Sequence, residues 1–124
     1  MLENIIIRQA QSSDLQTLVG LLNILFSIES DFIPEPKKQL HGLMMILADM
    51  ERCCAMVAEV NGEIAGMCTA QLVVSTAEGA LSGLIEDMVI EPKYRGRGIG
   101  RKLLTTLENW CFSKGATRIQ LLAD

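Results

Sequence analysis

The sequence predicts an α+β (α/β) fold in which helices flank a mixed, mostly antiparallel sheet. Two strand-like segments, 55–60 and 64–74, flank Asn61-Gly62, which is a strong hairpin signal. Other segments repeat apolar residues at helical spacing. A strand, helix and strand at the end of the chain imply one parallel strand pair. The expected order is β-α-α-β-β-β-α-β, in a single domain over residues 1–124.

The first half of the chain is predicted to hold one strand and two helices. Residues 5–8 form the strand, and Ser12 or Ser13 is expected to cap the first helix. Its apolar face comprises Leu15, Leu18, Val19, Leu22 and Phe26. Pro34 and Pro36 mark the break that follows. The second helix has an apolar face of Leu40, Leu43, Met44 and Leu47.

The second half is predicted to hold four strands and one helix. The expected strands are 55–60, 64–74, 84–90 and 118–123, and the expected helix is 98–114. Small residues over 75–82 are interpreted as a connection. Gly115 follows the helix, where a left-handed residue commonly ends one.

Composition narrows the function classes. The chain has 124 residues, 49% of them hydrophobic and 21% charged, which is typical of a globular domain. No apolar run reaches the roughly 18 residues that span a bilayer, so no membrane partner is expected. The net charge of −4 argues against a nucleic-acid partner. The four cysteines lack C-x-x-C spacing and one histidine accompanies them, so we expect free thiols, no metal and a cytoplasmic location.

The most informative segment is the glycine- and arginine-rich stretch that follows the fourth strand. Gly96, Gly98 and Gly100 leave the backbone open to close approach, and Arg95, Arg97 and Arg101 add positive charge. The stretch opens a helix, whose first N–H groups lack intrahelical partners and whose dipole end is positive. This order predicts a binding site for a diphosphate.

Two familiar phosphate-binding motifs do not fit the stretch. A Walker loop ends in Gly-Lys-Ser/Thr, whereas Gly100 is followed by Arg101-Lys102-Leu103. A dinucleotide fold needs G-x-G-x-x-G after the first strand, whereas the spacing here is G-x-G-x-G. The stretch instead resembles motif A of the GCN5-related N-acetyltransferases (GNAT). The residues that carry the resemblance are Ile90, Pro92, Tyr94, Arg95, Gly96, Gly98, Ile99, Gly100, Leu103 and Leu104.

The resemblance implies acetyl-CoA as the co-substrate and acetyl donor. The amides of Arg97, Gly98, Ile99 and Gly100 would hold its pyrophosphate, with Gly96 in the same loop and Arg95 and Arg101 adding charge. The backbone of Met88, Val89 and Ile90 would bind the pantetheine arm as another strand would. The amide of Met88 would face the thioester oxygen, in an oxyanion-hole role.

The acceptor side of the predicted site is assigned more loosely. Glu86 occupies a place where some members of the family carry a catalytic base. Strand alternation would put Glu86 on the same face as Met88 and turn Asp87 the other way. Glu29, Asp31 and Phe32 lie where the first two helices meet, a region that walls the acceptor site in relatives. Carboxylates there would suit a cationic amine of a small molecule or peptide.

The resemblance also implies more chain than the sequence contains. Members of the family continue past the fifth strand with another helix and a final strand pair. The helix often carries a tyrosine that serves as general acid. The sequence ends at Asp124 without them. The expectation is therefore a domain incomplete at its C-terminus, either because the chain is a fragment or because another chain supplies the missing surface. Its unpaired strand edge favours a homodimer, and without pairing at that edge a severe loss of stability is expected.

Three functions remain open on this reading. The first is an N-acetyltransferase that moves acetyl to a primary amine by direct attack. The second is a non-catalytic acyl-CoA-binding or regulatory module. The third is an interaction domain whose loop binds some other anion. Binding of coenzyme A separates the first two from the third, and turnover with amines separates the first from the second.

Overall fold

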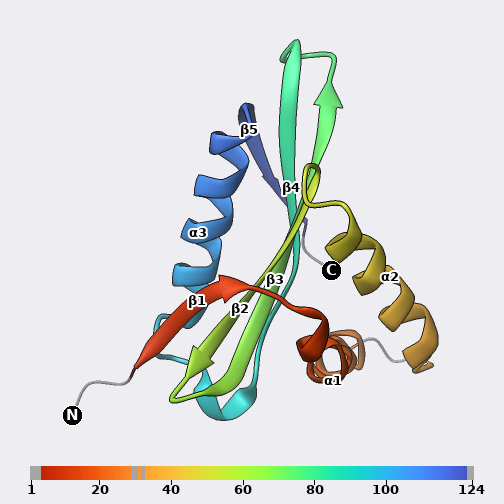
Figure 1. Ribbon diagram of the computed structural model, residues 1–124, viewed down its shortest axis with the longest axis vertical. Coiled ribbons are helices and arrows are strands. Elements are labelled where there is room, and N and C mark those ends of the chain that lie inside the picture. Colours follow the sequence, from red (N-terminus) through yellow and green to blue (C-terminus); the bar gives the residue numbers. More distant parts are fainter. Residues whose placement is uncertain (1–3, 29–30, 32, 123–124) are drawn as a thin grey trace.

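The fold is a five-stranded sheet covered by helices on both faces, seen in a computed structural model that describes residues 4–28, 31 and 33–122 (Figure 1). The strands lie in chain order across the sheet, antiparallel except for the parallel pair β4 and β5. Helix α3 covers one face, and α1 and α2 cover the other. The bounds are β1 Ile5–Gln9, α1 Leu15–Phe26, α2 Pro36–Ala48, β2 Cys53–Val60, β3 Glu63–Ser75, β4 Ala80–Ile90, α3 Ile99–Ser113 and β5 Ala116–Leu121. The predicted fold class and element order are confirmed.

The hairpin between β2 and β3 has the predicted turn. Asn61 (φ 51°) and Gly62 (φ 87°) both adopt left-handed conformations, which the tight turn between twisted strands requires. Similarly, Gly115 (φ 98°) follows the end of α3 in the expected left-handed conformation. These two signals succeed because each depends on backbone conformation over only a few residues.

The connection predicted over 75–82 is wrong. Strand β3 continues to Ser75 and β4 begins at Ala80, so the two strands pair almost to the tip of a long hairpin. Gly79 (φ 64°) closes the tip and donates its N–H to the Ser75 carbonyl at 2.9 Å. Small side chains lower strand propensity, but the ladder of hydrogen bonds with the partner strand outweighs that preference here.

The start of α1 also differs from the prediction. A 3₁₀ turn, Ser12–Asp14, precedes the helix, and neither serine caps it. Asp14 instead accepts the N–H of Gln11 at 2.7 Å and pairs with Arg8, which also contacts Glu59. The Arg8 guanidinium lowers the pKa of Asp14, which is only 7% exposed. This ion pair ties β1 to the entry of α1.

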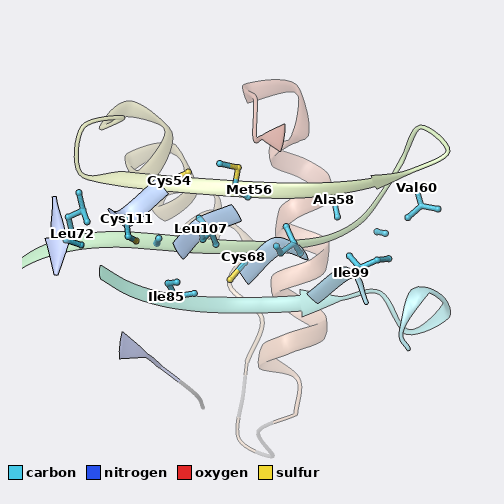
Figure 2. Packing of buried hydrophobic residues seen from close by; sticks show 14 residues of the cluster. Cys54, Met56, Ala58, Val60, Cys68, Leu72, Ile85, Ile99, Leu107 and Cys111 are labelled. Carbon is cyan, nitrogen blue, oxygen red and sulfur yellow. The ribbon is translucent and has the colours of Figure 1, made fainter. Parts of the chain in front are cut away.

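The core has two halves, one on each face of the sheet. Figure 2 shows the half beneath α3, where Leu107 and Cys111 pack on Cys68 and Ile85 of the strands. The other half lies beneath α1 and α2. Its buried residues are Leu18, Val19, Leu21, Leu22, Leu43, Val57, Met67 and Val89. Among the described residues, no helix is both long and apolar enough to cross a membrane.

Candidate functional site

The glycine- and arginine-rich stretch forms the loop between β4 and α3. Gly96 (φ 79°) and Gly98 (φ 80°) are both left-handed, and Gly98 is the residue before the first helical turn. The first intrahelical bond runs from the Lys102 N–H to the Gly98 carbonyl at 3.2 Å. A helix with this start has no intrahelical acceptor for the N–H groups of residues 99–101. The local geometry therefore fits a bound anion.

Glycine at position 98 leaves space on the outer side of the loop. A Cβ added to Gly98 would meet no atom within 4 Å, and the same holds for Gly96. Gly100 lies closer to the sheet, because its Cβ would stand 3.9 Å from the Met88 sulfur and 4.0 Å from Ile90. The start of α3 thus lies directly beside the end of β4.

Arginines lie in and beside the loop, and two of them donate to nearby backbone carbonyls. Arg95, Arg97 and Arg101 are all exposed. Arg97 donates to the Lys93 carbonyl at 3.2 Å and lies 5.3 Å from the centre of the Tyr94 ring. Arg95 donates from Nε to the Ile90 carbonyl at 3.0 Å, which places its side chain on the edge of β4.

Tyr94 anchors the loop to the sheet. Its hydroxyl donates to a Glu63 carboxylate oxygen at 2.9 Å, and this bond raises the pKa of Tyr94. Lys93 lies 3.8 Å from the same carboxylate. The sequence contains one tyrosine, and this hydrogen bond joins its side chain, in the loop, to the first residue of β3.

The edge of β4 that faces β5 is paired over half of its length. Pairing with β5 covers residues 81–85, and the Leu122 N–H extends it by one bond to the Ile85 carbonyl. From residue 86 to 90, no described residue of β5 pairs with β4. The Glu91 N–H bonds to Ala65 of β3, so strand alternation directs the backbone groups of Ile90 to the open edge. The open segment leads directly into the glycine loop.

A β-bulge interrupts β4 at Asp87 and Met88, within the segment that β5 leaves unpaired. Met67 pairs with Val89 but Thr69 pairs with Glu86, so Asp87 and Met88 together oppose Cys68. Asp87 has a left-handed backbone (φ 57°), an uncommon conformation that aspartate tolerates better than most residues. The bulge reverses the side-chain alternation beyond this point.

The predicted orientation of the carboxylates is therefore wrong. Glu86 pairs with Thr69 and so shares the α1–α2 face of the sheet, whereas Met88 packs with the core beneath α3. Asp87, expected to point away, lines a cavity on the α1–α2 face with Leu22 and Gln71. Two adjacent carboxylates consequently reach the same side of the sheet.

That cavity lies between α1, α2 and the sheet and has a volume of about 540 Å³. Its lining residues are Leu22, Phe26, Lys38, Gln39, Gly42, Leu43, Met45, Ile46, Asp49, Cys53, Gln71 and Asp87. The prediction missed the contribution of α2. The sequence does hold a signal, because four cavity-lining residues of α2 recur at helical spacing: Gln39, Gly42, Ile46 and Asp49. A search for hydrophobic periodicity does not find this face, because its residues are of mixed polarity. Nothing local in the sequence marks the bulge that turns Asp87 inward.

Of the three residues predicted to wall the acceptor site, the structure describes only Asp31. Glu29 and Phe32 lie outside the described residues. Asp31 is exposed in a turn and does not line the cavity. Its role stays a prediction.

The four cysteines are free, as predicted. Cys54, Cys68 and Cys111 are buried, and burial raises the pKa of Cys54 and of Cys68 to about 12. Burial also raises the pKa of Cys53, which lines the cavity. Thiols in this state hold their protons at neutral pH and are weak nucleophiles. No group of three or more His, Cys, Asp or Glu residues capable of holding a metal was found in the described ranges.

Comparison with known proteins agrees with this architecture. An aminoglycoside N(6')-acetyltransferase type 1 of Stenotrophomonas maltophilia is 27% identical over 89 residues, covering 69% of this chain and 58% of the relative. A glucosamine 6-phosphate N-acetyltransferase of Trypanosoma brucei brucei is 36% identical over 83 residues, covering 60% of this chain and 55% of the relative. The chain thus spans little more than half the length of the curated relatives it matches.

A solved structure shares the fold over nearly the whole chain. It is that of a predicted acetyltransferase with acetyl-CoA from Clostridium acetobutylicum, with a TM-score of 0.82 at 23% identity, covering 98% of this chain and 82% of that one. The sequence profile of the acetyltransferase (GNAT) family matches residues 20–124. This match includes the glycine loop, the bulged strand and the cavity-lining helix α2. The protein belongs to the acetyltransferase (GNAT) family.

Proposed function

We propose that the protein is an N-acetyltransferase that moves an acetyl group from acetyl-CoA to a primary amine of a small molecule or peptide. The observation that carries the proposal is the juxtaposition of the Gly96–Gly98 loop with the open edge of β4. A diphosphate-binding helix start and an unpaired strand edge together suit a ligand that joins a pyrophosphate to a peptide-like arm. Acetyl-CoA has that form.

The loop supplies the contacts for the pyrophosphate. The amides of Arg97, Gly98, Ile99 and Gly100 are the proposed donors. The exposed guanidinium groups of Arg95 and Arg101 add the attraction of opposite charge. The space beside Gly98, where a Cβ would meet nothing within 4 Å, supports access to these amides.

The edge of β4 supplies the contacts for the pantetheine arm. Met88 and Ile90 belong to the open edge by alternation, while Val89 pairs with Met67 inside the sheet. Because the Ile90 carbonyl already accepts from Arg95, we narrow the predicted backbone contacts from Met88, Val89 and Ile90 to the backbone of Met88 and the N–H of Ile90. An N–H at Met88 directed to the thioester oxygen would stabilise the negative charge that develops there.

The α1–α2 face of the sheet is the proposed site for the amine substrate and for the base that takes its proton. When bound, acetyl-CoA would supply a thioester carbonyl to which the neutral amine nitrogen adds. The C–N bond forms, the C–S bond breaks, and the departing thiolate takes up the second proton that the nitrogen loses. An alkyl amine is protonated near pH 7, so one proton must first pass to a base. Glu86, on the α1–α2 face, is the proposed acceptor of that proton, directly or through water.

A thermal-shift experiment followed by a turnover assay tests the proposal. Coenzyme A should raise the melting temperature, while phosphate and ATP should not. Release of free thiol in the presence of an amine panel should then reveal transfer. Glu86→Gln should keep coenzyme A affinity and lower kcat; normal turnover in this variant would rule out the role of Glu86. Absence of stabilisation by coenzyme A would reject the proposal as a whole.

A second candidate is a non-catalytic acyl-CoA-binding module. The observation that favours it is the hydrogen bond from the hydroxyl of Tyr94 to Glu63, which engages the one tyrosine of the sequence, so that this hydroxyl is not poised to protonate the leaving thiolate. Binding of coenzyme A without thiol release from any amine would support this candidate.

Two further predictions accompany the proposal. A homodimer would use the outer edge of β5, where no described strand pairs and where Leu121 and Leu122 are exposed. Light scattering coupled to size exclusion measures it, and a stable monomer would contradict it. A cytoplasmic location is supported by free cysteines, which are typical of reducing compartments.

A further inference from the structure

We infer that the cavity beside Asp87 takes a primary amine carried on an apolar body, in preference to an aminosugar. The inference rests on the proposed function and names the class of acceptor for it. The relatives described above act on an aminoglycoside and on glucosamine 6-phosphate by name, so the inference sets this chain apart from them.

The helices give the cavity an apolar wall. Leu22 and Phe26 of α1 and Leu43, Met45 and Ile46 of α2 contribute it. An alkyl or aryl group placed against these side chains loses contact with water, which is favourable. A sugar hydroxyl placed there would lose its water and gain no hydrogen-bond partner, which is unfavourable.

The sheet gives the cavity a polar floor. Asp87 and Gln71 line it from β4 and β3, and the Thr69 hydroxyl lies 3.5 Å from an Asp87 carboxylate oxygen. The left-handed backbone of Asp87 fixes the carboxylate at the bulge, immediately before Met88. An ammonium group bound to Asp87 would consequently stand next to the residue whose amide is proposed to face the thioester.

A buried acceptor atom adds to this polar set. Gln39 lines the cavity, and its Oε1 atom is buried without a hydrogen-bond partner in the described part of the chain. Such an atom carries an unfavourable desolvation energy until a donor reaches it. An amine supplies several N–H donors.

The charges around the cavity favour a cation. Asp87 and Asp49 contribute two carboxylates to the lining, and Lys38 contributes one ammonium group. The Lys38 ammonium also pairs with Glu35 at 2.9 Å. With two carboxylates against one ammonium group, the formal charge of the described lining is negative, which attracts an alkylammonium and disfavours a sugar phosphate.

Calorimetric titration of the whole chain at pH 7 with four probes tests the inference by binding alone. The probes are 2-phenylethylamine, 2-phenylethanol, kanamycin and glucosamine 6-phosphate. We expect 2-phenylethylamine to bind roughly tenfold or more tightly than each of the other three, the scale of one charge-assisted hydrogen bond. Equal affinity for 2-phenylethanol, or tighter binding of either sugar, overturns the inference.

Matched variants assign the binding to this cavity. Asp87→Asn preserves shape, and asparagine tolerates the left-handed backbone, so the variant should fold. It should weaken the binding of 2-phenylethylamine roughly tenfold and leave the affinity for coenzyme A unchanged. Met45→Gln alters the apolar wall at a residue that is 62% exposed, and it should also lower the affinity for 2-phenylethylamine. Glu108→Gln, a charge removal of the same kind on α3, should change neither; unchanged amine affinity in Asp87→Asn overturns the inference.

Parallel titration with coenzyme A separates the two proposals. Binding of 2-phenylethylamine without binding of coenzyme A supports the amine site and overturns the acetyltransferase proposal. Binding of coenzyme A with no affinity for 2-phenylethylamine overturns the inference and leaves the transferase proposal standing.

Discussion

Replacing Gly98 with alanine perturbs the loop at the point where the proposed diphosphate contacts converge. Gly98 has φ 80°, and a Cβ there would project into space that holds no atom within 4 Å. A left-handed alanine costs about 1–2 kcal/mol, partly offset by about 0.4–1 kcal/mol from the reduced freedom of the unfolded chain. The expected net loss of unfolding free energy is therefore about 1 kcal/mol.

The effect on coenzyme binding should be larger than the effect on stability. The new Cβ enters open space beside the proposed diphosphate contacts, and any relaxation of φ at Gly98 turns the neighbouring amides. Losing one hydrogen bond to a charged group costs about 1.5–3 kcal/mol, which weakens affinity by roughly 10- to 100-fold. Calorimetric titration with coenzyme A measures the affinity, and urea unfolding measures the stability.

Gly79→Ala is the matched control for this experiment. Gly79 is also left-handed (φ 64°) with nothing within 4 Å of a Cβ, but it lies at the tip of the β3–β4 hairpin (Figure 1). It should lose a similar amount of stability and keep the affinity of the unchanged protein. If Gly98→Ala loses the expected stability yet binds coenzyme A within twofold of the unchanged protein, the assignment of the loop is refuted.

Three further predictions concern stability and thiol chemistry. Because its folded pKa is depressed, the Asp14 carboxylate stabilises the fold above its ordinary pKa of 3.8 and loses that contribution as the pH falls through the folded pKa. In Asp14→Asn, the free energy of unfolding measured in urea should therefore depend less steeply on pH below pH 4. An unchanged slope would count against the Arg8 pair. Gly83→Ala places a Cβ 2.6 Å from the Cys111 sulfur, so it should cost about 1–3 kcal/mol in urea unfolding, and full stability would contradict the packing. Cys68, with a pKa of about 12, should react with iodoacetamide at pH 8 only on unfolding; rapid native labelling followed by mass spectrometry would disprove its burial.

The parts of the fold that the sequence predicts well are those that local physics determines. Asn61-Gly62 specifies its turn through backbone conformation, and Gly115 ends its helix in the same way. The Gly96–Gly98 stretch could be assigned to a helix start because strand, loop and helix signals follow one another directly. Each of these signals spans only a few residues.

The parts that the sequence does not predict depend on pairing between distant segments. The register of β3 against β4 decides that Asp87 and Met88 together oppose Cys68, and no local pattern reports that register. That register brings Asp87 to the cavity, on the same side of the sheet as Glu86. The length of the β3–β4 hairpin depends on the same pairing, which carries the strands through small residues.

Mapping coenzyme A on the protein by amide NMR tests the proposed coenzyme site at single-residue detail. We expect the largest chemical-shift changes at the amides of Arg97–Gly100 and at Met88 and Ile90 on the β4 edge, with much smaller changes from inorganic phosphate outside the loop. Changes confined to other surfaces, or a loop whose amides do not respond to coenzyme A, would contradict it.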